Sequence, residues 1–138
     1  MIVMMVRDVM TREPVTVDPR ARCHEARRMM DQHRIRHLPV TDQGRLVGIV
    51  SDRDVRSAMS GKPGANAGEI MTLDPLTVTS ETRIEHAARI MLDARVGSLP
   101  VVDGTLVGIV TYTDLLRAFV QVLETATQER IAVEADGP

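Results

Sequence analysis

Apolar residues recur at helical spacing in two separate stretches of this chain. In residues 22–35 and again in residues 84–94, apolar side chains fall three and four positions apart, so each stretch would present one apolar face as a helix. Asp18-Pro19 precedes the first stretch and Ser80 precedes the second, and these residue types favour helix starts. The pattern predicts two amphipathic helices that begin near these positions.

Short apolar runs of strand length surround these helices. Residues 15–17 and 76–79 are expected to be extended, and residues 37–41 and 46–51 are joined by the turn sequence Asp-Gln-Gly-Arg, which predicts a β-hairpin. The second hairpin turns at Asp103-Gly104, a compact turn signal. With a further helix after each hairpin, the pattern predicts strand, helix, strand, strand, helix twice, in the α/β (α+β) class.

The two sets of elements are copies of one sequence repeat. At an offset of 61 positions, "VMTREPVTVDP" aligns with "IMTLDPLTVTS", and "RIRHLPVTD" aligns with "RVGSLPVVD". Beyond Gln43 the offset becomes 60, and "GRLVGIVSDRDV" aligns with "GTLVGIVTYTDL". Two copies of this length favour a pseudo-twofold pair over a longer solenoid.

The repeat divides the chain into four parts. Residues 1–59 hold an N-terminal segment and the first copy, residues 60–68 form a Gly- and Pro-containing linker, residues 69–125 hold the second copy, and residues 126–138 form a tail. Neither copy is long enough to bury much apolar surface alone. We therefore expect the copies to pack sheet to sheet, with the last helix running toward Glu129 and "EADGP" frayed.

Composition narrows the classes of function. The 138 residues carry a formal net charge of −2 and include one Phe, one Tyr and no Trp. Without a basic excess or aromatic platforms, nucleic acid is not expected as a partner, and the run "HRIRH" is too short to change this. Cys23 is the only cysteine, which suits a reducing cytoplasm and excludes a cysteine-based metal site within one chain. The apolar N-terminus is too short to span a membrane and does not resemble a signal peptide.

The segments "GIVSDRD" and "GIVTYTD" place a hydroxyl three residues before an acid, at Ser51 and Asp54 and again at Thr111 and Asp114. This spacing is typical of a capping box, which satisfies the first backbone N–H groups of a helix. A carboxylate also has two acceptor oxygens, so each aspartate is able to hold both vicinal hydroxyls of a ribose. The adjacent helix N-terminus suits a phosphate. The two roles are compatible, and the sequence leaves both open.

The ordered set of "VMT" with a following "PVTV", then "LPV", then "LVGIV" with S/T-x-x-D occurs twice and resembles a pair of cystathionine β-synthase (CBS) domains, often called a Bateman module. The resemblance covers roughly residues 7–120. It implies two βαββα CBS motifs packed with pseudo-twofold symmetry around clefts for adenosine-containing ligands. Since no enzyme or transporter is attached, the chain resembles the free-standing bacterial and archaeal members.

The resemblance also implies a role for each matching position. Asp54 and Asp114 would hold ribose hydroxyls. Ligand hydroxyl and phosphate groups would be met by Ser51, Thr111, Thr113, Arg36, His37 and Arg53. The adenine would lie in an apolar slot that includes Met10, Val15, Ile35, Met71, Leu76 and Val96. No metal ligands and no catalytic residues are expected.

The two copies differ in charge at the positions that would face phosphate. The first copy has Arg36 and Arg53 where the second has Gly97 and Thr113. First-copy cations are expected to reach a ligand held on Asp114, so that site would bind charged phosphates better. The Asp54 site would keep Arg36 but meet uncharged residues from the second copy, and it would take a less charged adenosyl ligand or stay empty. The alternative for both arginines is a surface pair with Asp52 or Asp31.

These observations predict a regulatory module and not an enzyme, since no nucleophile–base pair or metal cluster is evident. The expected ligand is AMP, ADP or ATP, no cofactor is required, and an unidentified protein is the expected regulated partner. A homodimer is expected through the apolar stripe after Asp114, which holds Leu115, Leu116, Phe119, Val120 and Leu123. The alternatives are a structural interaction subunit with vestigial clefts and a binder of S-adenosylmethionine or NAD.

Overall fold

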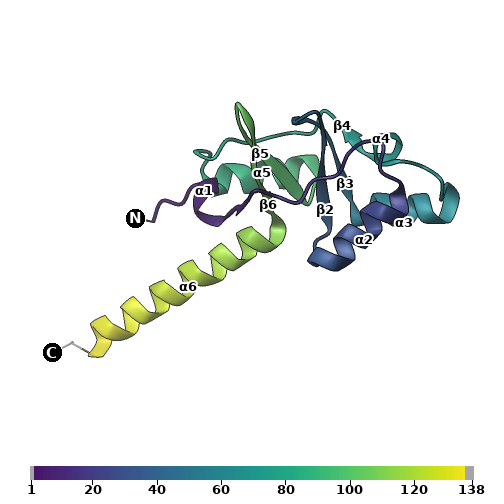
Figure 1. The fold of residues 1–138 in the computed structure, drawn as a ribbon. Helices are drawn as coiled ribbons and strands as arrows, with labels where there is room; N and C mark the ends of the chain where they lie inside the picture. Colours follow the sequence, from purple (N-terminus) through teal and green to yellow (C-terminus); the bar gives the residue numbers. More distant parts are fainter. Residues whose placement is uncertain (1, 136–138) are drawn as a thin grey trace.

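The computed structural model describes residues 2–135, in which two three-stranded sheets are each covered by helices (Figure 1). The first repeat contains helix α2 (Cys23–His33), strands β2 (His37–Asp42) and β3 (Arg45–Ser51), and helix α3 (Asp52–Gly61). The second repeat contains α5 (Ile84–Ala94), β5 (Ser98–Asp103), β6 (Thr105–Thr111) and α6 (Tyr112–Ala135). The predicted α+β class and the paired arrangement of two repeats are confirmed.

The short elements that precede each repeat cross to the other repeat. They are α1 (Val6–Val9) and β1 (Thr11–Arg12) at the N-terminus, and α4 (Ala67–Ile70) and β4 (Thr72–Leu73) between the repeats. Strand β1 pairs antiparallel with β6, whereas β4 pairs antiparallel with β3. The sheets therefore have the orders β1-β6-β5 and β2-β3-β4, and each is completed by the other repeat.

Backbone hydrogen bonds hold this exchange in place on both sides. The first N–H groups of α4 donate to the loop before α2, with Gly68 N to Pro19 O at 2.8 Å and Ala67 N to Ala21 O at 2.7 Å. In the same way, Val6 N of α1 donates to Thr82 O at 2.7 Å, in the loop before α5. These bonds satisfy helix N–H groups that otherwise lack an intrahelical partner.

The exchange corrects two of the sequence-based expectations. Residues 15–17 and 76–79 do not form the first strands, because only Val17 and Val78 make single parallel bridges, to Val40 and Val101. The first helices begin at Cys23 and Ile84, four residues after the predicted starts. Asp18 instead turns the chain by accepting Arg20 N–H at 2.8 Å, and the carbonyls that follow it bond to α4.

A glycine at the centre of each long strand makes room for the crossing strand. A β-carbon on Gly48 of β3 would lie 2.8 Å from the Thr72 carbonyl oxygen of β4. A β-carbon on Gly108 of β6 would lie 2.8 Å from the Thr11 carbonyl oxygen of β1. The glycine in each "LVGIV" segment is thus explained by close backbone approach.

Each repeat has its own apolar core, and each core includes a residue from the exchanged helix. The first core consists of Val17, Ala26, Met30, Leu38, Val40, Val50, Val55 and Ala67. The second consists of Val6, Val78, Ala87, Met91, Leu99, Val101 and Val110. Val6 of α1 is completely buried in the second core, and Ala67 of α4 is completely buried in the first. The two repeats are therefore joined by packing as well as by strand pairing.

Helix α6 is longer than predicted and reaches Ala135, beyond Glu129. It leaves the body of the molecule and projects as a rod (Figure 1). The expectation of a frayed end falls on residues 134–138, of which 136–138 lie outside the described residues. No helix within residues 2–135 combines the length and the apolar character that crossing a bilayer requires.

Candidate ligand-binding cleft

A cleft of about 880 Å³ lies between the two repeats, which is within the size range of small-molecule sites. Its first-repeat wall comes from the start of β2, the end of β3 and the first turn of α3. Its second-repeat wall comes from the segment after β4, the end of α5 and the start of β5. Of the predicted site residues, it contains Arg36, His37, Ser51, Arg53, Asp54, Leu76 and Val96.

Asp54 lies in the first turn of α3, at the point where β3 ends. Its Oδ2 accepts the Ser51 backbone N–H at 2.9 Å, and the Ser51 hydroxyl accepts the Asp54 N–H at 3.1 Å. The capping box expected at this position is therefore present. Within the described part of the chain, Oδ1 of Asp54 has no hydrogen-bond partner, and the half-buried side chain borders the cleft. Capping leaves one carboxylate oxygen available to a ligand.

Asp114 forms the same capping arrangement at the start of α6 but is more enclosed. Its Oδ2 accepts both the backbone N–H of Thr111 at 2.9 Å and the Thr111 hydroxyl at 3.1 Å. Its Oδ1 lies 3.5 Å from a guanidinium nitrogen of Arg117, and the residue is only 8% exposed. Asp114, Thr111 and the exposed Thr113 do not line the cleft that contains Asp54.

Positive charge exceeds negative charge around the cleft. Its lining includes Arg36, Arg53, Arg56 and Arg95, and on the acidic side Asp52, Asp54 and Asp74. Asp52 pairs with Arg56 at 3.0 Å, and outside the cleft Asp31 pairs with Arg27 at 3.5 Å. The alternative in which these two acids hold Arg36 and Arg53 is therefore wrong. Both arginines lack an ion-pair partner among the described residues, which leaves them available to an anion.

His37 lies at the meeting point of the two repeats. A β-carbon on Gly97 would be 3.1 Å from His37 Nε2 and 3.6 Å from the Tyr112 ring. The pKa of His37 is lowered, mainly because burial disfavours the imidazolium, an effect that the nearby Asp54 carboxylate opposes and Arg36 reinforces. An anion that entered the cleft would favour the protonated form.

The six residues of the expected adenine slot are not gathered in one place. Leu76 and Val96 line the cleft from the second repeat. Met71 packs on Gly48 of β3, which leads to Asp54, and Met10 packs on Gly108 of β6, which leads to Asp114. Val15 and Ile35 are partly buried against the first core. Their roles toward an adenine stay predictions.

Several cleft residues were not predicted from the sequence. Thr72, Asp74 and Pro75 reach the cleft because β4 crosses to the first sheet. Arg95 follows the last residue of α5 and brings a cation from the second repeat into the cleft. Its aligned residue Arg34 has the same left-handed backbone, with a φ of 55° against 57° for Arg95, but does not line the cleft. The sequence-based expectation that the Asp54 site meets only uncharged residues of the second repeat is therefore wrong, because Arg95 lines the same cleft. The sequence signal that could have identified Arg95 is its alignment with Arg34, an arginine at the same place in the first repeat.

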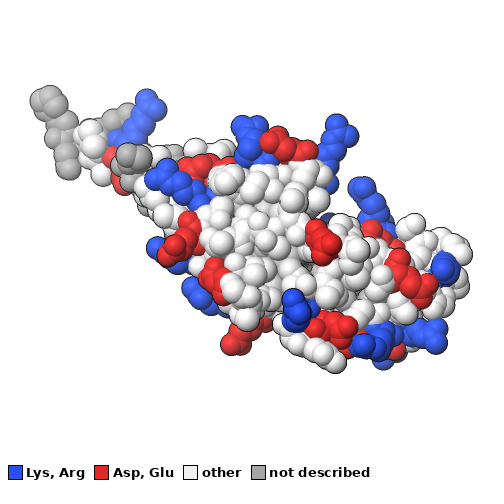
Figure 2. All heavy atoms as spheres, turned by 90° about the horizontal axis from the view of Figure 1, so that it is seen from above, with Lys and Arg blue, Asp and Glu red and all other residues white. Residues whose placement is uncertain are grey.

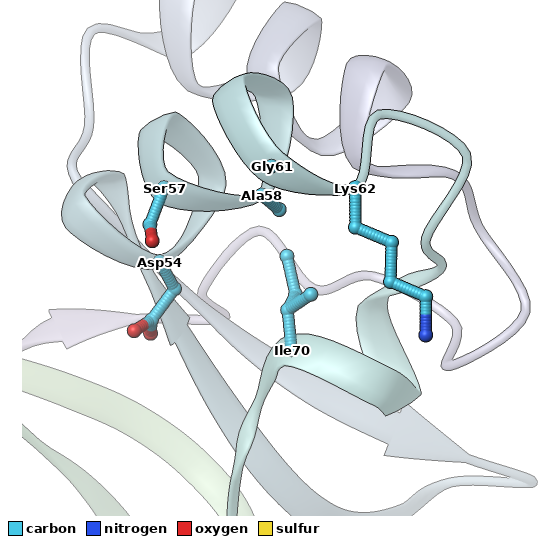
Figure 3. A pocket seen from close by; sticks show the side chains of 6 residues that line it. All are labelled: Asp54, Ser57, Ala58, Gly61, Lys62 and Ile70. Atoms are coloured by element: carbon cyan, nitrogen blue, oxygen red, sulfur yellow. The ribbon is translucent and has the colours of Figure 1, made fainter.

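A smaller cavity of about 330 Å³ also borders Asp54 (Figure 3). Asp54, Ser57, Ala58 and Gly61 lie along one side of α3, and Ile70 of α4 points toward them. Lys62 at the rim pairs with Glu69 at 3.2 Å. Asp54 thus borders two cavities.

Seen from above, uncharged atoms cover broad parts of the body, a group of acidic atoms lies near its middle, and most other charged side chains lie along its outline (Figure 2). This distribution gives no continuous basic face on that side. The positive charge relevant to a ligand is the local excess in the cleft.

Two α/β repeats that exchange their first strands and enclose a cleft define a tandem-repeat module. The CBS domain family matches the chain twice, over residues 6–61 and 67–121. The chain therefore belongs to the CBS domain family and carries a tandem pair of these domains.

Two relatives illustrate how such pairs occur. The chain is 35% identical over 114 residues to the CBS domain-containing protein YhcV of Bacillus subtilis, covering 80% of this chain and 81% of YhcV. It is 42% identical over 106 residues to an inosine-5'-monophosphate dehydrogenase of Korarchaeum cryptofilum, covering 75% of this chain but only 22% of that enzyme. The similarity to the enzyme is thus limited to a fraction of its length.

Two solved structures show similar folds with ligands bound. The CBS domain pair of protein MJ0100, in complex with methylthioadenosine and S-adenosyl-L-methionine, has a TM-score of 0.83 and 32% identity, covering 87% of this chain and 98% of that one. CBSX2 of Arabidopsis thaliana, in complex with AMP, has a TM-score of 0.74 and 34% identity, covering 86% of this chain and 97% of that one. Both neighbours bind adenosine-containing molecules.

Proposed function

We propose that this chain is a regulatory module, without catalytic activity of its own, that binds an adenine nucleotide in the cleft between its repeats. The observation that carries the proposal is the position of Asp54 at a helix N-terminus, in a cleft shared with Arg36 and Arg53, which form no ion pair within residues 2–135. The Asp54 carboxylate accepts ribose hydroxyls through its available oxygen, and the phosphates lie toward Arg36 and Arg53. The adenine packs against Leu76 and Val96.

The ligand class is AMP, ADP or ATP. The AMP complex of the similar CBSX2 supports this class, and so does the excess of arginine in the cleft. S-adenosylmethionine is the competing ligand, because the similar MJ0100 pair binds it together with methylthioadenosine. A phosphate gains more from unpaired arginines than a sulfonium does, which favours the nucleotide.

Binding is expected to bias the arrangement of the two repeats, since both contribute to the cleft walls. A ligand that prefers one arrangement shifts the population toward it and presents a changed surface to a partner protein in the cytoplasm. We also propose that two copies associate through the apolar side of α6, where Leu116, Phe119 and Leu123 are at least half exposed.

Calorimetric titration of AMP, ATP and adenosine tests the proposal. Asp54→Ala should weaken all three ligands by more than about tenfold, because each carries the ribose. Arg36→Ala and Arg53→Ala should weaken ATP more than adenosine, with Arg28→Ala on the exposed face of α2 as the matched control. Unchanged binding in a folded Asp54→Ala variant would contradict the ribose assignment.

A thermal-shift series separates this proposal from a structural subunit with vestigial clefts. A ligand that binds only the native state must raise its stability. AMP, ATP, NAD and S-adenosylmethionine are compared at millimolar concentration. If none of the four ligands raises the melting temperature, the structural subunit is favoured. If only S-adenosylmethionine raises it, S-adenosylmethionine and not an adenine nucleotide is the ligand.

A further inference from the structure

Asp54 and Asp114, the two aspartates proposed to bind ribose, differ in the contacts that their carboxylates already make within the protein. At Asp114, Oδ2 accepts two hydrogen bonds from Thr111, and Oδ1 faces the Arg117 guanidinium at 3.5 Å. At Asp54, Oδ2 accepts only the Ser51 N–H, and Oδ1 has no hydrogen-bond partner within the described residues. Within residues 2–135 neither Oδ1 atom accepts a hydrogen bond, but a guanidinium nitrogen lies 3.5 Å from Oδ1 of Asp114, whereas no ion pair forms at Asp54.

The repeat alignment identifies the residue that makes this difference. At the offset of 60, Arg117 aligns with Ser57, and both stand one helical turn after the aspartate. Ser57 is short and borders the cavity beside Asp54, in which Gly61 also leaves space (Figure 3). Arg117 fills the equivalent position in the second repeat with a long cation that reaches back to Asp114.

We propose that Arg117 acts as an internal competitor for the Asp114 carboxylate, so that the module binds its nucleotide at Asp54 and disfavours a second nucleotide at Asp114. The inference rests on the proposed ribose role of these aspartates. According to this proposal, Arg117, which lies outside the repeated motif, determines whether one or two nucleotides bind per chain. This ranking is opposite to the one expected from the cleft cations alone.

Competition and access act in the same direction. A ribose at Asp114 must displace the guanidinium from Oδ1, so part of the gain from its hydrogen bonds to the carboxylate is offset by the loss of the ion pair with Arg117. Asp114 is also 8% exposed and lines neither the inter-repeat cleft nor the cavity beside α3. Asp54 borders both of these cavities, and among the described residues it forms no ion pair that a ligand would have to break.

Calorimetric titration with AMP on the full chain tests the inference through stoichiometry. The unmodified protein should bind about one AMP per chain, and Asp54→Ala should lose that site while Asp114→Ala keeps it. Arg117→Ser should add a second site with about three- to fivefold higher affinity than any residual binding at Asp114, the range that an exposed ion pair supports. The double variant Asp54→Ala/Arg117→Ser isolates the released site, and it should regain the binding that Asp54→Ala lost.

The reciprocal exchange gives an independent arm. Ser57→Arg places a cation one turn after Asp54 and should lower AMP affinity at that site by at least tenfold. Arg27→Ser is the matched control for Arg117→Ser, because it removes another exposed same-helix ion pair, also at 3.5 Å, from a helix outside the cleft. Circular dichroism and thermal unfolding confirm that each variant is folded, and Arg117→Gln serves as a milder substitute.

The outcomes separate the two proposals. Two equal sites in the unmodified protein, lost one at a time with each aspartate, would overturn the role of Arg117 and leave the ribose assignment intact. A double variant that fails to regain binding would overturn it in the same way. AMP binding that is indifferent to both aspartates would instead contradict the proposed function, and the inference would fail with it.

Discussion

The imidazole of His37 lies directly against the α-carbon of Gly97, so that a β-carbon at position 97 would come within 3.1 Å of Nε2. His37 opens the first hairpin and Gly97 precedes the second, and both border the cleft. The absence of a side chain at position 97 lets the two repeats approach here. The same absence keeps the cleft open on its second-repeat side.

Gly97→Leu should therefore displace His37 and narrow the cleft. We expect a loss of about 1–3 kcal/mol in the free energy of unfolding, together with at least tenfold weaker AMP binding. Urea denaturation and calorimetry measure the two effects. Gly61→Ala is the control, because a β-carbon there meets nothing within 4 Å, and this variant should retain full stability. Normal AMP affinity in Gly97→Leu would contradict the placement of the ligand in this cleft.

Stability should fall as the pH is lowered through the titration of His37. Burial lowers its folded pKa below the unfolded value of 6.5, and Asp54 and Asp52 oppose this shift only partly. Between the two values the unfolded state binds more protons, so the free energy of unfolding decreases as pH falls through and below about 6.5.

Thermal unfolding between about pH 7.5 and about pH 5 should show this loss, and His37→Gln should reduce it. The other histidines, His24, His33 and His86, are exposed and supply a common background in both proteins. Identical pH profiles for the two proteins would show that His37 does not carry the effect.

The capping hydroxyls should contribute to stability independently of any ligand. Ser51→Ala removes the acceptor for Asp54 N–H and should cost about 1 kcal/mol, and Thr111→Ala should cost a similar amount at α6. Chemical denaturation without nucleotide measures both. A Ser51→Thr variant keeps the hydroxyl and should be close to the unmodified protein, and a loss equal to that of Ser51→Ala would argue against capping.

The exchanged strands should depend on the central glycines. Gly48→Ala and Gly108→Ala each place a methyl group against the carbonyl of the crossing strand, at 2.8 Å from Thr72 O or Thr11 O. We expect each to destabilise the protein by about 1–3 kcal/mol and to speed amide exchange at β4 or β1 respectively. Hydrogen exchange read by mass spectrometry locates the change, and equal exchange at both strands in either variant would contradict the assignment.

Association of two copies should depend on the apolar side of α6. Phe119→Glu places a charge within the exposed stripe and should convert a dimer to a monomer in size-exclusion chromatography with light scattering. Gln128→Glu adds the same charge away from this stripe and should leave the dimer intact. Since Phe119 is 58% exposed in the single chain, the variant should still fold, and an unchanged molar mass would place the interface elsewhere.

Much of the fold follows from local sequence pattern. The two amphipathic helices within residues 22–35 and 84–94, the two hairpins and the S/T-x-x-D capping boxes all form, because each depends on residues close together in the chain. The helix starts are the exception, since both helices begin four residues later than predicted. The duplicated motif also identifies the family. The S/T-x-x-D motif correctly predicts that Asp54 lies in the first turn of a helix that follows a strand.

Tertiary structure alone decides which residues meet. The pairing of Thr11 with Ile109 joins positions at opposite ends of the chain, and no local periodicity specifies such a partner. The corresponding pairing of β4 with β3 brings Thr72 and Leu76 to the cleft beside Asp54, and the packing of the repeats brings Arg95 into the same cleft. The burial of Asp114, which is 8% exposed, likewise depends on its neighbours in the fold, whereas its contact with Arg117 joins residues three apart on one helix. The sequence determines two similar aspartates, and their surroundings make them inequivalent because access and hydrogen bonding depend on three-dimensional neighbours.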